Sequence, residues 1–85
     1  MIKFSKHSLE QIRDRGTNNE EVEETIKSGE QILAKKGRVA FRKNFDFNSN
    51  WKGGKYKIKQ VMPIVKLEGD DYIVITVYVF YFGGE

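Results

Sequence analysis

The sequence predicts an α+β fold, in which two N-terminal helices pack on one face of a four-stranded antiparallel sheet. Residues 6–28 carry apolar side chains at helical spacing, whereas the apolar residues after Gly29 alternate with a period of two. The strongest signal is the stretch 55–82, where two runs rich in Val, Ile, Tyr and Phe flank polar turn residues at 67–71. That pattern is typical of a β-hairpin, because glycine supplies a positive φ and acidic residues accept local backbone hydrogen bonds.

The first predicted helix covers residues 6–15. Ser5 stands where a side-chain oxygen caps a helix, and Leu9 and Ile12 lie about one turn apart, so both are expected to face the core. Gly16 follows the last helical residue and is expected to end the helix.

A second helix is predicted up to Ser28. Thr17 and Glu20 have the spacing of a capping box, which satisfies free backbone N–H groups at a helix start. Val22 and Ile26 are four residues apart and form its expected buried side. The acidic residues of this helix make it a poor reader of the DNA major groove.

Four strands are predicted after Gly29, over residues 31–35, 38–47, 55–64 and 72–82, with a loop at 48–54. The last strand is apolar on both parities apart from Thr76, so we expect it to be central and buried on both faces. Apolar and polar residues alternate in the second and third strands, which predicts one core face and one open, basic face. Pro63 lacks a backbone donor and marks an edge, a bulge or the end of regular pairing.

Composition limits the class of protein. The 85 residues form one domain, 1–85, with a modest core, which fits either a monomer or a homodimer. With no cysteine and one histidine, the chain offers no disulfide framework and no metal-ligand spacing, and no cofactor is expected. The first residues lack the apolar core of a signal peptide, and the run 72–82 is too short to span a bilayer as a helix. The prediction is a cytoplasmic protein with no membrane contact.

Positive charge is concentrated in the middle of the chain. The formal charge is −2 over residues 1–34, +9 over 35–66 and −4 over 67–85. So basic a segment indicates either a face that binds a polyanion, most simply nucleic acid, or a solvated strand face. If the second and third strands are neighbours, four cations are expected to form a nucleic-acid-binding patch: Arg38, Arg42, Lys57 and Lys59.

The first helix carries the candidate proton-transfer and phosphate-binding groups. His7 lies near the helix start, where the dipole favours the neutral imidazole that a general base needs. A histidine that caps the helix or packs against the sheet is the alternative. Arg13 and Arg15 each suit either a phosphate or a neighbouring carboxylate.

The last strand adds hydroxyl groups. Thr76 supplies one in an apolar run, where it can support a reaction or simply bond a carbonyl. Tyr78 and Tyr81 can stack on bases, donate to a phosphate or fill the core. A base, cations and hydroxyls are sufficient for RNA cleavage without a metal, because the 2′-hydroxyl of RNA supplies the nucleophile.

Residues 5–16 read SKHSLEQIRDRG, a second helix ends at Gly29, and the last strand contains IVITV at 73–77. This order resembles the uncharacterised bacterial family numbered 4258 among the domains of unknown function, which is grouped by fold with RelE-like and BrnT-like toxins. The resemblance implies a RelE- or barnase-like fold, a single toxin-like nuclease domain, RNA as substrate, and a cognate antitoxin or immunity protein as partner.

The resemblance also assigns residues. It places the family's histidine on His7, its second arginine on Arg15 and its strand hydroxyl on Thr76. The family's first arginine falls on Gln11. With Tyr78 as hydrogen-bonding support, the expected function is a metal-independent endoribonuclease that cleaves RNA by attack of the 2′-hydroxyl. The alternative is a non-catalytic nucleic-acid- or partner-binding module of a toxin–antitoxin type of system.

Overall fold

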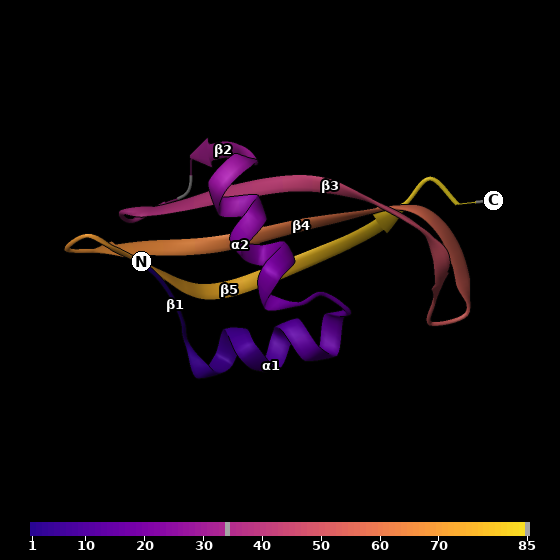
Figure 1. Cartoon of the computed structure of the whole chain (residues 1–85), viewed down its shortest axis with the longest axis horizontal. Coiled ribbons are helices and arrows are strands. Elements are labelled where there is room, and N and C mark those ends of the chain that lie inside the picture. The colour runs from indigo at the N-terminus through magenta and orange to yellow at the C-terminus, as the bar shows by residue number, and fades with distance from the viewer. Residues whose placement is uncertain (34, 85) are drawn as a thin grey trace.

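A computed structural model describes residues 1–33 and 35–84, with Leu33 as backbone only, and has an α+β architecture (Figure 1). The prediction of four antiparallel strands is wrong, because the sheet has five strands in the order β1-β5-β4-β3-β2 and the β1–β5 pair is parallel. The elements along the chain are β1 (Ile2–Phe4), α1 (Lys6–Arg15), α2 (Asn19–Ser28), β2 (Glu30–Leu33), β3 (Arg38–Trp51), β4 (Gly54–Glu68) and β5 (Asp71–Phe82). Within the described ranges, neither helix is long and apolar enough to cross a membrane.

The strand that sequence analysis missed is β1. Its three residues pair in parallel with Tyr72–Val74 at the start of β5. Backbone bonds continue at both ends, since the Tyr72 N–H donates to Met1 O at 2.9 Å and the Ser5 N–H donates to Val74 O at 3.0 Å. Three residues are too few to show a period of two, so only the long-range pairing reveals this strand.

Helix α1 has the predicted bounds. The Ser5 hydroxyl accepts from the Ser8 N–H at 3.1 Å, and Gly16 ends the helix with a left-handed φ of 81°. The expected burial of Leu9 is wrong, because its side chain is 41% exposed. Ser8 takes the buried place beside Ile12, and its hydroxyl is satisfied by donating to Ser5 O at 2.8 Å.

Helix α2 begins one residue later than the predicted capping box requires. The cap is Asn18, whose side-chain oxygen accepts from the Glu21 N–H at 2.8 Å. Thr17 instead donates its hydroxyl to the Glu21 carboxylate at 2.7 Å. Val22 and Ile26 are buried as predicted.

The predicted loop at 48–54 is wrong, because these residues belong to the β3–β4 hairpin. Its turn contains only Lys52 and Gly53, both with positive φ (47° and 86°), as a type I′ turn requires. A register shift between Asp46 and Ser49, with Asn48 at φ 46°, marks a bulge that bends the hairpin. We call residues 47–57 the arm. Figure 1 shows the arm curving from the sheet toward the side on which α1 lies.

The helices cover one face of the sheet. The core lies between them and the strands, and consists of Ile12, Val22, Ile26, Phe41, Val61, Val65, Val74 and Val77. Alternate residues of β4 and β5 point to the other face, which we call the open face; cross-strand pairs such as Met62 with Tyr78 and Gln60 with Phe80 lie on it.

The expectation that β5 is central and buried on both faces is wrong, because the helices cover only one of its faces and most of β5 lies at an edge. The residues after Val74 have no strand on their outer side, because β1 pairs only with Tyr72–Val74. On the open face, Tyr78, Phe80 and Phe82 are 41%, 45% and 41% exposed.

Pro63 lies in a central strand and is buried. Regular pairing of β4 with β3 stops beside it, between the pairs Ala40–Ile64 and Lys43–Val61. The register with β3 is the same on both sides of this gap, whereas the register with β5 shifts between Ile64 and Val65. Of the three sequence alternatives, an edge, a bulge or the end of regular pairing, the structure therefore shows a bulge next to Pro63.

Two truncations on α1 test this packing. Ile12→Ala is expected to lower the free energy of unfolding by about 2–5 kcal/mol, because it leaves a cavity in the core. Leu9→Ala, the matched control on the exposed side, is expected to cost less than about 1 kcal/mol. Urea unfolding followed by circular dichroism measures both; equal losses would contradict the assignment of the buried side.

Candidate nucleic-acid interface

His7 is the second residue of α1, as predicted, and its side chain is exposed. It is therefore not sealed in packing. It makes no hydrogen bond, ion pair or ring contact with the described part of the chain. The structure leaves its imidazole facing solvent on the helical side of the molecule.

Arg15 binds the backbone of β5. One guanidinium nitrogen donates to Val77 O at 2.7 Å, and the guanidinium carbon lies 5.4 Å from the centre of the Tyr78 ring. One turn earlier, the Gln11 side-chain oxygen accepts from the Val77 N–H at 2.7 Å. Arg15 therefore contacts a backbone carbonyl and an aromatic ring. It does not pair with a neighbouring carboxylate, which was the alternative to phosphate binding in the sequence analysis.

The predicted four-cation patch does not form. Arg38 and Arg42 lie on the open face, whereas Lys59 shares its side of β4 with the buried residues Val61 and Val65. Lys57 has the same parity as Lys59. Sequence analysis chose the wrong parity in β4 as the core, because Ile58, Met62 and Ile64 are also apolar.

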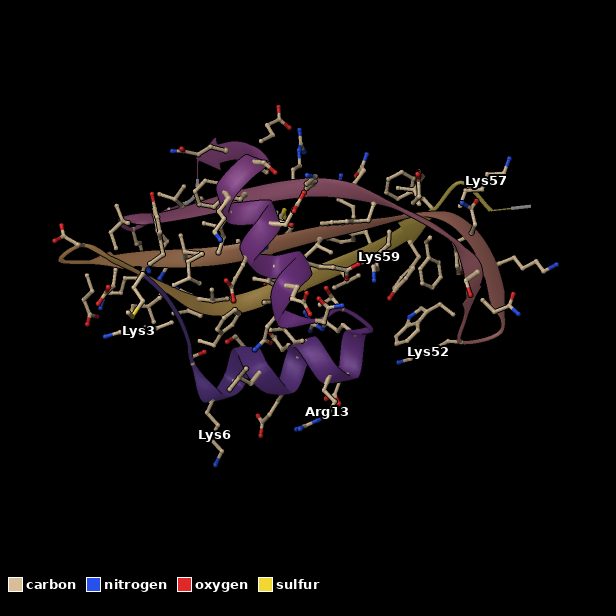
Figure 2. All side chains as sticks on the ribbon, viewed as in Figure 1. Lys3, Lys6, Arg13, Lys52, Lys57 and Lys59 are labelled. Carbon is tan, nitrogen blue, oxygen red and sulfur yellow. The ribbon has the colours of Figure 1, made fainter. Side chains whose placement is uncertain are left out.

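Lys59 is only 7% exposed and lies under the turn between the helices (Figure 2). Its ammonium group is 2.7 Å from the Glu21 carboxylate and donates to Gly16 O at 3.1 Å. A buried charge is tolerated only when it is paired and hydrogen-bonded in this way. The contacts of Lys59 are therefore structural.

Thr76 lies on the open face opposite Ile64, while α1 packs on the helical side of β5. The structure therefore does not bring Thr76 together with His7. Of the four residues predicted to be catalytic, it joins only Arg15 and Tyr78.

The arm folds against Tyr81. The Tyr81 ring centre lies 5.1 Å from those of Phe47 and Trp51, with Trp51 stacked at 19°, and 5.7 Å from that of Tyr56. Its hydroxyl donates to Arg15 O at 2.7 Å. Burial, and secondarily the negative charge of Glu21, raises the pKa of the Tyr81 hydroxyl above its usual value.

Gly16 makes this close packing feasible. A Cβ atom there would lie 2.5 Å from the Tyr81 hydroxyl and 2.7 Å from the Trp51 ring. The left-handed φ of 81° disfavours other residues independently.

A pocket of about 190 Å³ opens between the tip of the arm, the end of α1 and β5; we call it the tip pocket. It is lined by Asp14, Arg15, Trp51, Lys52, Tyr78, Val79 and Tyr81. Sequence analysis did not select Lys52 or Trp51, because it assigned both to a loop. The Asn48 bulge and the two-residue turn, not composition, bring them to this site.

Next to the tip pocket, Tyr78, Phe80 and Phe82 form what we call the aromatic row on the open face of β5. The rings of Tyr78 and Phe80 are nearly parallel, at 17°, with centres 6.3 Å apart. Exposed ring faces of this kind are platforms on which bases can stack.

Ion pairing redistributes the basic charge of the middle segment. The paired cations are Arg42 with Glu30, Lys43 with Glu24, Lys59 with Glu21, and Lys66 with Glu68. Within residues 1–33 and 35–84, by contrast, Lys52, Lys55 and Lys57 of the arm have no carboxylate partner. Figure 2 shows Lys52 at the tip of the arm and Lys57 near the end of β5. Lys35, Lys36 and Arg38 also lack a carboxylate partner within these ranges, but they lie at the opposite end of the sheet. The arm is therefore the unpaired positive region that adjoins the aromatic row.

Comparison with known proteins gave no match, either among family models, among curated proteins or among solved structures. The family resemblance of residues 5–16 therefore stays a prediction.

Removing the Lys59 charge should destabilise the fold. Lys59→Met leaves the Glu21 carboxylate with the Thr17 hydroxyl but without its cation, and removes the ammonium donor of Gly16 O. It is expected to lower the free energy of unfolding by about 2–4 kcal/mol. Lys43→Met breaks the exposed pair with Glu24 and is expected to cost less than about 1 kcal/mol. Thermal and urea unfolding of both variants measure the contrast. A Lys59→Met protein as stable as Lys43→Met would show that the buried pair does not hold the layers together.

Proposed function

We propose that the protein binds single-stranded RNA along the aromatic row, with the arm supplying positive charge. The observation that carries the proposal is the meeting of three exposed rings of β5 with the unpaired lysines of the arm at one end of the sheet. Proteins that bind single strands combine these two features, since rings stack on bases and cations follow the phosphates.

Several further contacts support the site. Arg15 and Lys52 both line the tip pocket beside Tyr78, so cations lie next to the first ring of the row. The backbone of β5 is held there by Gln11 and Arg15, which presents the rings on a fixed strand. RNA rather than DNA is chosen because the resemblance of residues 5–16 implies an RNA substrate.

Loss of one ring should weaken binding. Phe80→Ala is expected to raise the Kd for an oligouridine by roughly 5- to 150-fold, the equivalent of about 1–3 kcal/mol for one stacked base. Leu67→Ala, which removes an exposed apolar side chain elsewhere on the sheet, should leave the Kd unchanged. Fluorescence anisotropy measures both, with DNA of the same sequence as a second ligand. Equal affinities of the two variants, or no RNA binding by the wild type, would refute the proposal.

The charge contribution has its own signature. Each lost phosphate contact lowers the slope of log Kobs against log salt by about 0.7 for a single strand, so Lys52→Gln with Lys57→Gln should reduce it by about 1.4. Lys35→Gln with Lys36→Gln removes the same charge from the turn before β3, remote from the row, and should leave the slope unchanged. Identical slopes for both double variants would argue against phosphate contacts on the arm.

RNA cleavage is a second candidate function, favoured by the meeting of Arg15 and Tyr78 in the tip pocket. In this reaction the 2′-oxygen forms a bond to phosphorus and the bond to the 5′-oxygen breaks, while a base takes the 2′ proton and an acid protonates the leaving oxygen. In the tip pocket, Arg15 is the candidate for charge stabilisation. His7, the predicted proton-transfer group, lies eight residues earlier on α1 and does not line this pocket. A cognate antitoxin or immunity protein is the partner that the resemblance adds.

Cleavage is tested with end-labelled RNA. If the candidate holds, the wild type cuts the RNA, while His7→Ala cuts it at least 100-fold more slowly and binds it equally well, because His7 contacts nothing that holds the fold. Lys6→Ala, an exposed neighbour on α1, is the control. Intact RNA after incubation with the wild type would exclude cleavage while leaving the binding proposal standing.

A further inference from the structure

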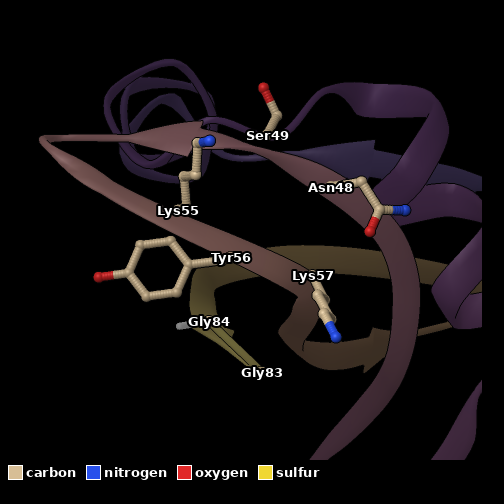
Figure 3. A pocket seen from close by; sticks show the side chains of 7 residues that line it. All are labelled: Asn48, Ser49, Lys55, Tyr56, Lys57, Gly83 and Gly84. Atoms are coloured by element: carbon tan, nitrogen blue, oxygen red, sulfur yellow. The ribbon is translucent and has the colours of Figure 1, made fainter.

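A second pocket, of about 200 Å³, lies where the arm meets the end of β5; we call it the end pocket (Figure 3). Three segments line it, with Asn48 and Ser49 from β3, Lys55, Tyr56 and Lys57 from β4, and Gly83 and Gly84 from the chain after β5. Gly83 directly follows Phe82, the last ring of the aromatic row.

The end pocket is lined by hydrogen-bond donors and cations. Its side chains supply two ammonium groups, an amide and two hydroxyls, and no described lining residue is a carboxylate. In this it differs from the tip pocket, where Asp14 opposes an anion. The end pocket is thus the more favourable of the two for a group with more than one negative charge.

Backbone conformation builds this lining. The bulge places Asn48 in a left-handed conformation with φ 46°, at the point of β3 where Asn48 and Ser49 line the pocket. On the other side, a Cβ atom at Gly84 would clash with Lys55 O, so glycine lets the chain lie flush against β4.

We propose that the end pocket binds a terminal phosphate monoester of the RNA strand that occupies the aromatic row. This inference rests on the proposed function. Two ammonium groups favour a terminal phosphate, which carries a charge of about −1.5 to −2, over the single charge of a linking phosphodiester. The volume lies below the 300–1,000 Å³ typical of sites for whole small molecules, and suits a group of a few heavy atoms. A strand whose last base stacks on Phe82 has its end beside this pocket.

The test compares six-nucleotide uridine RNAs that carry a 5′-phosphate, a 3′-phosphate or neither. For the wild type, one phosphorylated form is expected to bind about tenfold or more tightly than the unphosphorylated form, the gain of charge-assisted hydrogen bonds. Which end gives the gain identifies the direction of the strand. In Lys55→Gln with Lys57→Gln, the gain should vanish, whereas Lys35→Gln with Lys36→Gln should keep it.

The outcomes separate this inference from the proposed function. Equal Kd values for all three RNAs, with binding still weakened in Phe80→Ala, would overturn the phosphate site and leave the aromatic row intact. A phosphate gain that survives in the Lys55/Lys57 double variant would also overturn it, because the phosphate would then bind elsewhere. Failure of all three RNAs to bind would overturn both.

Discussion

The ammonium group of Lys59 is the constraint on which the arrangement of the layers depends. It is almost fully buried, and a charge taken out of water costs several kcal/mol unless a partner compensates it. The Glu21 carboxylate and Gly16 O meet this requirement, so the turn between the helices must lie directly over this point of β4. The Tyr81 hydroxyl, bonded to Arg15 O, ties the same turn to β5. The end of α1, the start of α2 and two strands are thereby fixed to one another.

The same pairing decides where positive charge remains available. Helix α2 is acidic, and its Glu21 and Glu24 neutralise Lys59 and Lys43 on the strands beneath it. A segment with a formal charge of +9 therefore does not produce a uniformly basic sheet face. Its centre is neutralised, and the unpaired lysines of the arm lie beyond the reach of α2. Unpaired cations also remain at 35–38, but the arm is the unpaired region beside the aromatic row, and the RNA site is proposed there for that reason.

Features set by neighbouring residues, such as helix caps and turns, were predicted from the sequence. Features set by contacts between distant residues, such as strand pairing, were missed. The bounds of α1 and the turn at Gly69 follow from caps and glycine φ preferences that neighbouring residues set. Strand β1 is too short to show the two-residue alternation of apolar and polar side chains. The bulge at Asn48 depends on how β3 pairs with β4. Of the candidate site, Arg15 and Tyr78 were found from residue type, but the buried role of Lys59 was not. Lys59 faces the helices because Glu21 of α2 pairs with it, and the sequence of β4 alone gives no sign of that partner.

Gln11 shows how the edge of β5 bears on the choice between binding and cleavage. The outer N–H and C=O groups of Val77 have no neighbouring strand, and an exposed edge of this kind is prone to pair with other chains. Gln11 and Arg15 cover it with one acceptor and one donor. An arginine at position 11, as the family resemblance would place there, has no acceptor and could not receive the Val77 N–H. Relative to that arginine, glutamine exchanges a cation one turn after His7 for a closed strand edge. That exchange favours a rigid platform for the aromatic row over added charge near His7, and it is the local reason for ranking RNA binding ahead of RNA cleavage.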